Sequence, residues 1–141
     1  MIVLDTNVIS EVMKPVPDPV VKDWLDAQVD ETMWLTSVTV FEIACGVEQL
    51  PSGKRKTALV DAFNELIVKD FQNRVLAFDD QHARKAGELW AKLKSLGRVS
   101  EFRDIQIAGI VATFKATLAT RNTRHFLDTG VKLIDPWNVT P

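Results

Sequence analysis

Three acidic residues that lie far apart in the sequence stand where an α/β fold would bring them together. Asp5 ends a short apolar run, Glu42 lies early in a helical segment, and Asp104 opens a long apolar segment. In an open parallel sheet, the usable crevice lies beyond the carboxyl ends of the strands. We therefore expect the three carboxylates to converge on one edge of a sheet.

The chemistry that these residue types offer is the binding of a hard cation. Three clustered carboxylates without a cation would repel one another and raise one another's pKa values. Oxygen ligands favour Mg²⁺ or Mn²⁺, and the chain has one cysteine and two histidines, too few at suitable spacing for a zinc site. Cys45 and Gly46, one turn after Glu42, are small and leave room beside its carboxylate.

Each acid also has a purely structural interpretation. Asp5 is a good N-cap for the segment that follows it. Thr39 and Glu42 match the capping-box pattern of a helix start, and Asp104 would stabilise the positive end of its own helix. The two interpretations are compatible, because a carboxylate at a helix N-terminus is held in the ionised state that a cation requires.

The elements that must position these residues alternate along the chain. Apolar stripes at helical spacing separate the apolar runs, and the segment Ile105–Phe114 is apolar nearly all round, which predicts a buried helix. This alternation predicts an α/β fold: one domain, residues 1–141, with a mainly parallel, five-stranded twisted sheet flanked by helices. The predicted strands are Ile2–Leu4, Trp34–Thr36, Val75–Phe78, Thr117–Ala119 and Val131–Ile134.

Composition limits the function classes. The 141 residues are 46% hydrophobic and 26% charged, with a net charge of -2, so a nucleic-acid-binding role has to depend on a local basic patch. The single cysteine excludes an internal disulfide and fits the reducing cytoplasm. No signal peptide or membrane-spanning run is recognisable, and we expect a cytoplasmic protein without a membrane partner.

Four sequence motifs span the whole chain. They are Ile2-Val-Leu-Asp5-Thr6-Asn7, Thr36-Ser-Val-Thr-Val-Phe-Glu42, Arg103-Asp104-Ile-Gln-Ile-Ala108, and Thr120-Arg121-Asn122-Thr-Arg-His-Phe126 with the later Asp135-Pro136-Trp137. They resemble the motifs of PIN domains, and in particular those of the VapC/FitB-like toxins of bacterial type II toxin–antitoxin systems. Each motif alone is weak, but all four occur in the family's order and at its separations.

The resemblance implies a metal-dependent endoribonuclease in which Asp5, Glu42 and Asp104 hold one or two Mg²⁺ ions, with Mn²⁺ as a substitute. A metal-bound water would then attack the RNA phosphodiester and leave a 5′-phosphate and a 3′-hydroxyl. Asn122 stands where many family members have a fourth acid. Its amide brings no negative charge, so a second ion should bind more weakly.

The resemblance also implies further site residues. Thr6, Thr120 and Arg121 are the predicted substrate-binding residues, and the two hydroxyls could instead orient the carboxylates. His125 stands between basic residues and could contact a phosphate, but we expect it to pack in a turn.

Toxins of this kind pair with a small antitoxin that inserts a basic side chain into the acidic pocket, and they commonly form homodimers. DNA would be bound only indirectly, through the antitoxin. The amphipathic segments 20–28 and 57–70 are where we expect a groove for a partner helix.

Two other classes of protein remain open. A receiver-like phosphoacceptor domain is suggested by Phe78-Asp79-Asp80 at a strand end, although no lysine follows a later strand as that chemistry requires. A catalytically inactive PIN-like scaffold that binds RNA or protein is the second alternative. It is favoured by Asn122 and opposed by the presence of all three acids. Which RNA is cut depends on loop shape and stacking surfaces that a sequence does not reveal.

Overall fold

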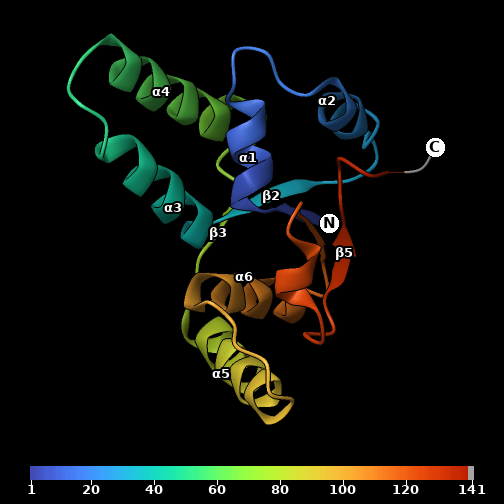
Figure 1. Cartoon of the computed structure of the whole chain (residues 1–141). Helices are drawn as coiled ribbons and strands as arrows, with labels where there is room; N and C mark the ends of the chain where they lie inside the picture. Colours follow the sequence, from blue (N-terminus) through green and yellow to red (C-terminus); the bar gives the residue numbers. More distant parts are fainter. Residues whose placement is uncertain (140–141) are drawn as a thin grey trace.

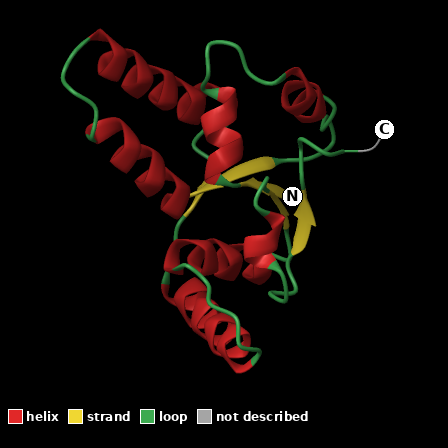
Figure 2. Ribbon diagram, in the orientation of Figure 1, coloured by secondary structure: helices red, strands yellow, loops and turns green. Residues whose placement is uncertain are grey.

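A parallel sheet of five short strands runs through the middle of the molecule (Figures 1 and 2). The computed structural model describes residues 1–139. The strand order is β3-β2-β1-β4-β5, and every neighbouring pair is parallel. The strands are β1 (Ile2–Leu4), β2 (Met33–Thr36), β3 (Val75–Leu76), β4 (Thr117–Ala119) and β5 (Lys132–Ile134). The first strand of the chain is thus the central one, and all three of its residues are buried.

Within residues 1–139, six α-helices and two short helical turns connect the strands. Side chains fix several of the helix starts: Asp18 caps α2 ahead of Pro19, Thr36 caps α3, and Asp79 forms a capping box with His82 at the start of α5. The helices are α1 (Thr6–Val12), α2 (Pro19–Asp26), α3 (Ser37–Glu48), α4 (Lys54–Glu65), α5 (Asp80–Ser95) and α6 (Phe102–Thr113), with a π-helical turn η1 (Leu66–Asp70) and a 3₁₀ turn η2 (Thr123–Phe126).

Helices cover both faces of the sheet. In Figure 1, α1, α2 and α4 lie above the sheet and α5 and α6 below it. Each face has its own apolar core, the upper one including Val8, Ile9 and Phe63 and the lower one including Ile107 and Ile110. Burial on both faces explains why the strands are continuously apolar rather than alternating.

The two helices below the sheet pack unusually closely at one glycine. A Cβ atom added to Gly109 of α6 would lie 2.7 Å from the carbonyl oxygen of His82 and 2.9 Å from the Cβ of Ala86, both in α5. Only a residue without a side chain allows these two backbones to approach so closely.

The structure confirms the predicted fold class, and the sheet is wholly rather than mainly parallel. The third strand ends two residues earlier than predicted, at Leu76, because the chain already turns there toward α5; the Phe78 N–H donates to Ser37 Oγ at 3.0 Å. The last two residues of the predicted domain, 140 and 141, lie outside the described part. Within residues 1–139, no helix has the length and apolar character needed to span a membrane.

Candidate active site

Asp5 is the best-anchored acid of the site. It leaves the central strand directly, caps α1 by accepting the Thr6 N–H at 2.8 Å, and is only 4% exposed. Its second carboxylate oxygen accepts the Thr120 hydroxyl at 2.7 Å and the Asn7 amide at 3.1 Å. Burial raises the pKa of Asp5, and these hydrogen bonds oppose that rise.

Glu42 reaches the same place from α3. Thr6 Oγ1 donates to Glu42 Oε1 at 2.9 Å and lies 3.1 Å from the hydroxyl of Thr39. Thr6 therefore links the helix that Asp5 caps to the helix that carries Glu42. The predicted capping box of Thr39 and Glu42 is wrong, because α3 begins three residues earlier than a Thr39 cap requires and its cap is Thr36, whose hydroxyl accepts the Thr39 N–H at 3.1 Å.

Asp104 lies in the first turn of α6, as predicted. Its Oδ2 is 3.0 Å from Nδ1 of His125, a residue of η2. His125 was expected to pack in a turn, and the structure instead places its ring against a site carboxylate. Nothing in the spacing of the two residues, 21 positions apart, indicates this contact.

Electrostatic coupling links Asp5 to each of the other two acids. Burial raises the pKa of Glu42, and the charge of Asp5 raises it further. The same two causes raise the pKa of Asp104 to about 6, and His125 moderates the shift. A carboxyl group with a pKa near neutrality, beside a second buried carboxylate, is typical of a functional site.

The segment after β4 completes this edge of the sheet. The fully buried Thr120 hydroxyl donates to Asp5 and accepts both the Asn7 amide at 3.2 Å and the Asn122 N–H at 3.0 Å. The Asn7 side-chain oxygen accepts the Arg121 N–H at 3.1 Å. Sequence reasoning missed Asn7; its place two residues after Asp5, in the first turn of α1, was the available signal.

Two of the predicted residues lie at the rim. Asn122 is exposed, and within residues 1–139 its recorded hydrogen bonds are made by its backbone. The Arg121 guanidinium lies over the Trp137 ring, 5.0 Å from its centroid. Arg103, which was not predicted as a site residue, pairs with Glu101 and approaches Glu42 Oε2 to 3.9 Å. The rim thus carries cations and amides around an acidic centre.

The donor set suits a hard cation that keeps part of its water shell. Mg²⁺ is commonly bound through one or two carboxylates and several waters. Among residues 1–139, no three His, Cys, Asp or Glu side chains are close enough together to enclose a metal ion. Asp5 nevertheless raises the pKa values of both Glu42 and Asp104, which indicates negative charge that a divalent ion would neutralise.

Two hollows adjoin the acids. One, of about 360 Å³, extends from Asp104 and His125 toward Arg98 and Arg124. The other, of about 560 Å³, is mostly apolar and runs from Thr6 and Glu42 between α1, α3 and α4. The acidic centre therefore lies between a hollow lined by basic residues and an apolar groove.

The five-stranded parallel sheet carries acids at its carboxyl edge, and comparison with protein families identifies the class to which this arrangement belongs. The PIN-domain family model matches residues 2–132. The chain therefore belongs to the PIN-domain family, and the resemblance seen in its motifs is confirmed.

Individual relatives cover nearly the whole chain. It is 41% identical over 137 residues to a plasmid stability protein, StbB, of Pseudomonas syringae pv. tomato, an alignment that covers 97% of this chain and 99% of the relative. It is 39% identical over 137 residues to the VapC ribonuclease Y4jK of Sinorhizobium fredii, with 97% of this chain and 98% of the relative covered.

Solved structures give the same result. The chain superimposes on the crystal structure of FitAcB from Neisseria gonorrhoeae with a TM-score of 0.90 and 35% identity, covering 99% of this chain and 100% of that one. A structure of FitAB bound to a DNA fragment gives a TM-score of 0.91 at the same identity, covering 100% and 99%.

Proposed function

We propose that this protein is a Mg²⁺-dependent endoribonuclease and the toxin of a toxin–antitoxin pair, acting in the cytoplasm. The observation that carries the proposal is the convergence of Asp5, Glu42 and Asp104 on the carboxyl edge of the sheet, where Asp5 raises the pKa values of the other two. Membership of the PIN-domain family and a relative named as a VapC ribonuclease support it.

Asp5, Glu42 and Asp104 are the residues that would hold the ion, with Mn²⁺ able to replace Mg²⁺. When bound, such an ion makes a water nucleophilic near neutral pH and stabilises the charge of an in-line phosphoryl displacement. The buried Asp5 is the fixed point of the set, since three hydrogen-bond donors hold its carboxylate. Glu42 and Asp104 are more exposed and can adjust to an ion.

Neighbouring residues position these acids. The hydroxyl of Thr120 orients Asp5, that of Thr6 orients Glu42, and the His125 ring orients Asp104. These contacts favour the interpretation that the two threonines orient carboxylates rather than bind substrate directly. Arg121 and Asn122 are both exposed at the rim. We assign Arg121 to contact with the RNA phosphate and Asn122 to the catalytic site beside the three acids.

The decisive experiment is cleavage of a panel of structured RNAs by the purified protein with Mg²⁺ or Mn²⁺, compared with the same reaction in EDTA. Asp5→Asn, Glu42→Gln and Asp104→Asn keep the shapes of the side chains and remove their charges. We expect each to lower the cleavage rate by at least about a hundredfold, as loss of a preorganised electrostatic group does. Products should carry a 5′-phosphate and a 3′-hydroxyl.

A matched control for this experiment is Asp61→Asn, which removes an exposed carboxylate from α4. It should cleave like the wild type. Equal trace cleavage by the wild type, all three site variants and the EDTA reaction would contradict the proposal and favour the inactive PIN-like scaffold. The receiver-like alternative is wrong, because the chain belongs to the PIN-domain family and Asp79 caps α5.

The antitoxin is the partner we assign to the apolar groove beside Glu42. Part of the predicted segment 57–70 borders this groove, through Ala58 and Leu59, whereas α2 from segment 20–28 does not. A partner helix lying there would bring a basic side chain within reach of Glu42. The DNA-bound FitAB structure supports DNA binding by such a complex, with the antitoxin making the contacts in our proposal.

A homodimer is also part of the proposal. Trp90 of α5 and Phe102 of α6 are 38% and 69% exposed and border an apolar hollow of about 340 Å³. Exposed aromatic residues of this kind are enriched at protein interfaces. Light scattering should give twice the chain mass, and Phe102→Glu should give the monomer.

A further inference from the structure

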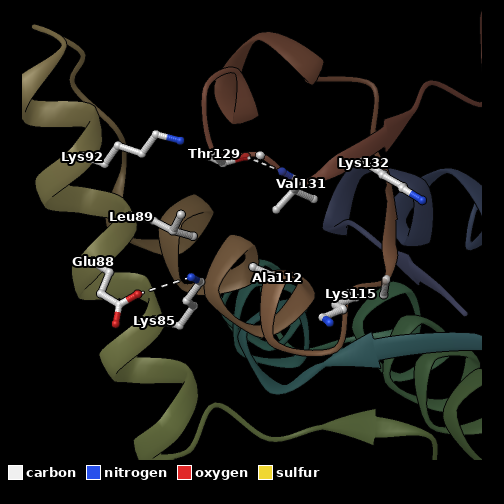
Figure 3. Close-up of a pocket in the computed structure, with 11 residues that line it drawn as sticks. Lys85, Glu88, Leu89, Lys92, Ala112, Lys115, Thr129, Val131 and Lys132 are labelled. Carbon is white, nitrogen blue, oxygen red and sulfur yellow. Dashed lines mark hydrogen bonds and ion pairs between the residues drawn. The ribbon is translucent and has the colours of Figure 1, made fainter.

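A second hollow in the molecule is lined by lysines and lies away from the acids. It has a volume of about 520 Å³ and is bounded by α5, the end of α6 and the start of β5. Figure 3 shows Lys92 extending from α5 toward Thr129 across this space. Its basic residues are Lys85, Lys92, Lys115 and Lys132, and we call it the lysine pocket.

The charge of the lysine pocket is poorly balanced. Its one acid, Glu88, pairs with Lys85 at 3.3 Å. Within residues 1–139, Lys92, Lys115 and Lys132 form no ion pair. In a chain with a net charge of -2, three lysines without an ion-pair partner on one concave surface are a local excess of positive charge. A bound anion would relieve their repulsion.

Lys115 occupies a backbone position that favours glycine. It follows the end of α6 with a φ of 51°, and the Ala116 N–H bonds back to the Val111 carbonyl at 3.1 Å, which closes the helix end. Glycine is the usual residue at such a position. A lysine therefore stands here at a conformational cost, which is consistent with a use for its side chain.

The lysine pocket lies at the opposite end of α6 from Asp104. Asp104 lies in the first turn of α6 and Lys115 just past its last turn, so they are separated by roughly 16 Å at 1.5 Å per residue. That length equals about five nucleotides of a stacked strand at 3.4 Å each. Both the lysine pocket and the hollow beside Asp104 lie between α5 and the segment 124–132. Arg98, Arg124 and His125 line the hollow beside Asp104.

The lining of the pocket indicates which part of a nucleic acid it would contact. Its uncharged side chains are aliphatic or hydroxyl-bearing, as at Leu89, Val131 and Thr129, and none is aromatic. Base recognition on single strands relies on aromatic stacking platforms. Lysines without such platforms suit phosphates, which they contact as flexible point charges regardless of sequence.

We propose that the lysine pocket binds the phosphodiester backbone of the substrate RNA, several nucleotides away from the bond that is cut. This inference rests on the proposed ribonuclease function. It predicts that the enzyme distinguishes a short RNA, which reaches only the acids, from a longer RNA that also reaches the lysines.

Binding in EDTA tests the proposal without cleavage. The probe is a fluorescent stem-loop RNA, titrated with the full-length protein at increasing KCl. The variant combines Lys92→Gln, Lys115→Gln and Lys132→Gln. We expect about tenfold weaker binding or more, and a salt dependence reduced by roughly two to three phosphate contacts. Glu88→Gln should have the opposite effect and tighten binding.

Two controls separate this role from general charge and folding effects. Lys22→Gln, Lys54→Gln and Lys69→Gln together remove the same charge from α2, α4 and η1, on the other face of the sheet, and should leave the affinity nearly unchanged. Lys115→Gly relieves the left-handed backbone and should keep or raise Tm while still weakening RNA binding.

Cleavage distinguishes failure of this inference from failure of the proposed function. If the wild type cleaves no RNA, the proposed function fails. If it cleaves, the lysine variant should lose kcat/KM on a stem-loop and keep it on the shortest RNA that is cut. Unchanged affinity and salt dependence in the lysine variant would overturn the inference. So would binding of polyglutamate at the pocket as tightly as RNA, since that outcome favours an acidic protein partner.

Discussion

Asp5 performs two tasks with one carboxylate. It accepts the first free N–H of α1, and its other oxygen is held by Thr120 and Asn7 facing two further acids. A helix N-terminus favours negative charge, so the cap also helps to keep a buried carboxylate ionised. One arrangement of Asp5 therefore fits both its structural interpretation, as a helix cap, and its chemical interpretation, as a site carboxylate.

The first prediction concerns the ionisation of Asp104. Burial and Asp5 raise its pKa from 3.8 to about 6, so the folded state binds this proton more tightly than the unfolded state. The contribution of Asp104 to stability is therefore most favourable below its ordinary pKa and is lost as the pH rises through about 6. Asp104→Asn should raise Tm by a few degrees at about pH 8 in EDTA, and by much less near pH 4.

Thermal unfolding of both proteins across this pH range measures the effect, with Asp61→Asn as the matched exposed control. A Tm gain for Asp104→Asn that does not change with pH would contradict the assigned cause. The same raised pKa predicts that metal-dependent cleavage increases between about pH 5 and pH 7, since a cation requires the ionised carboxylate.

At the residue scale, the sequence predicted positions better than contacts. Asp5 and Asp104 could be placed because each adjoins a recognisable strand or helix. The hydrogen bond from Thr6 that supports Glu42 could not be predicted, because Thr6 lies 36 positions away and only the folded sheet brings it to the carboxylate. His125 was misjudged for the same reason.

At the element scale, the contact between α5 and α6 depends on Gly109. The second prediction compares two glycines in these helices. Gly109→Ala should destabilise the protein by about 1–3 kcal/mol through overpacking against His82 and Ala86, although alanine is the better helix former. Gly87→Ala, where the added Cβ meets no atom within 4 Å, should stabilise it by about 0.5–1 kcal/mol.

Urea unfolding of the two variants measures both changes. Equal stabilisation by the two substitutions would show that α5 and α6 can separate without cost. Because α6 carries Asp104 and α5 borders the lysine pocket, Gly109→Ala should also lower cleavage at temperatures where the protein is still folded.

The elements themselves were largely predictable. Apolar runs located all five strands, because strands buried on both faces have no polar alternation to obscure them. Boundaries were less certain. The start of α3 was missed by three residues, since Thr36 and Thr39 are both plausible caps and only the backbone selects between them. The close approach at Gly109 has no signature in a single sequence.

At the scale of the whole molecule, an ion bound among the acids would be linked to folding. The third prediction is that Mg²⁺ or Mn²⁺ raises Tm at about pH 8 and has little effect near pH 5. A ligand at a hundred times its Kd adds about 2.7 kcal/mol to the free energy of unfolding. Differential scanning fluorimetry with increasing metal measures the shift. An equal shift in a variant with Asp5→Asn, Glu42→Gln and Asp104→Asn would place the ion elsewhere.

The position of β1 has a consequence for the synthesis of the protein. The central strand leaves the ribosome well before its neighbour β4, which lies at residues 117–119, and Thr120, which holds Asp5, follows directly. Pairing between such distant segments is slow to form and must wait for synthesis to reach them. A nascent chain that ends before residue 117 thus lacks both β4 and the hydroxyl that holds Asp5. The cell that makes this protein is exposed to its chemistry only once synthesis has passed these residues.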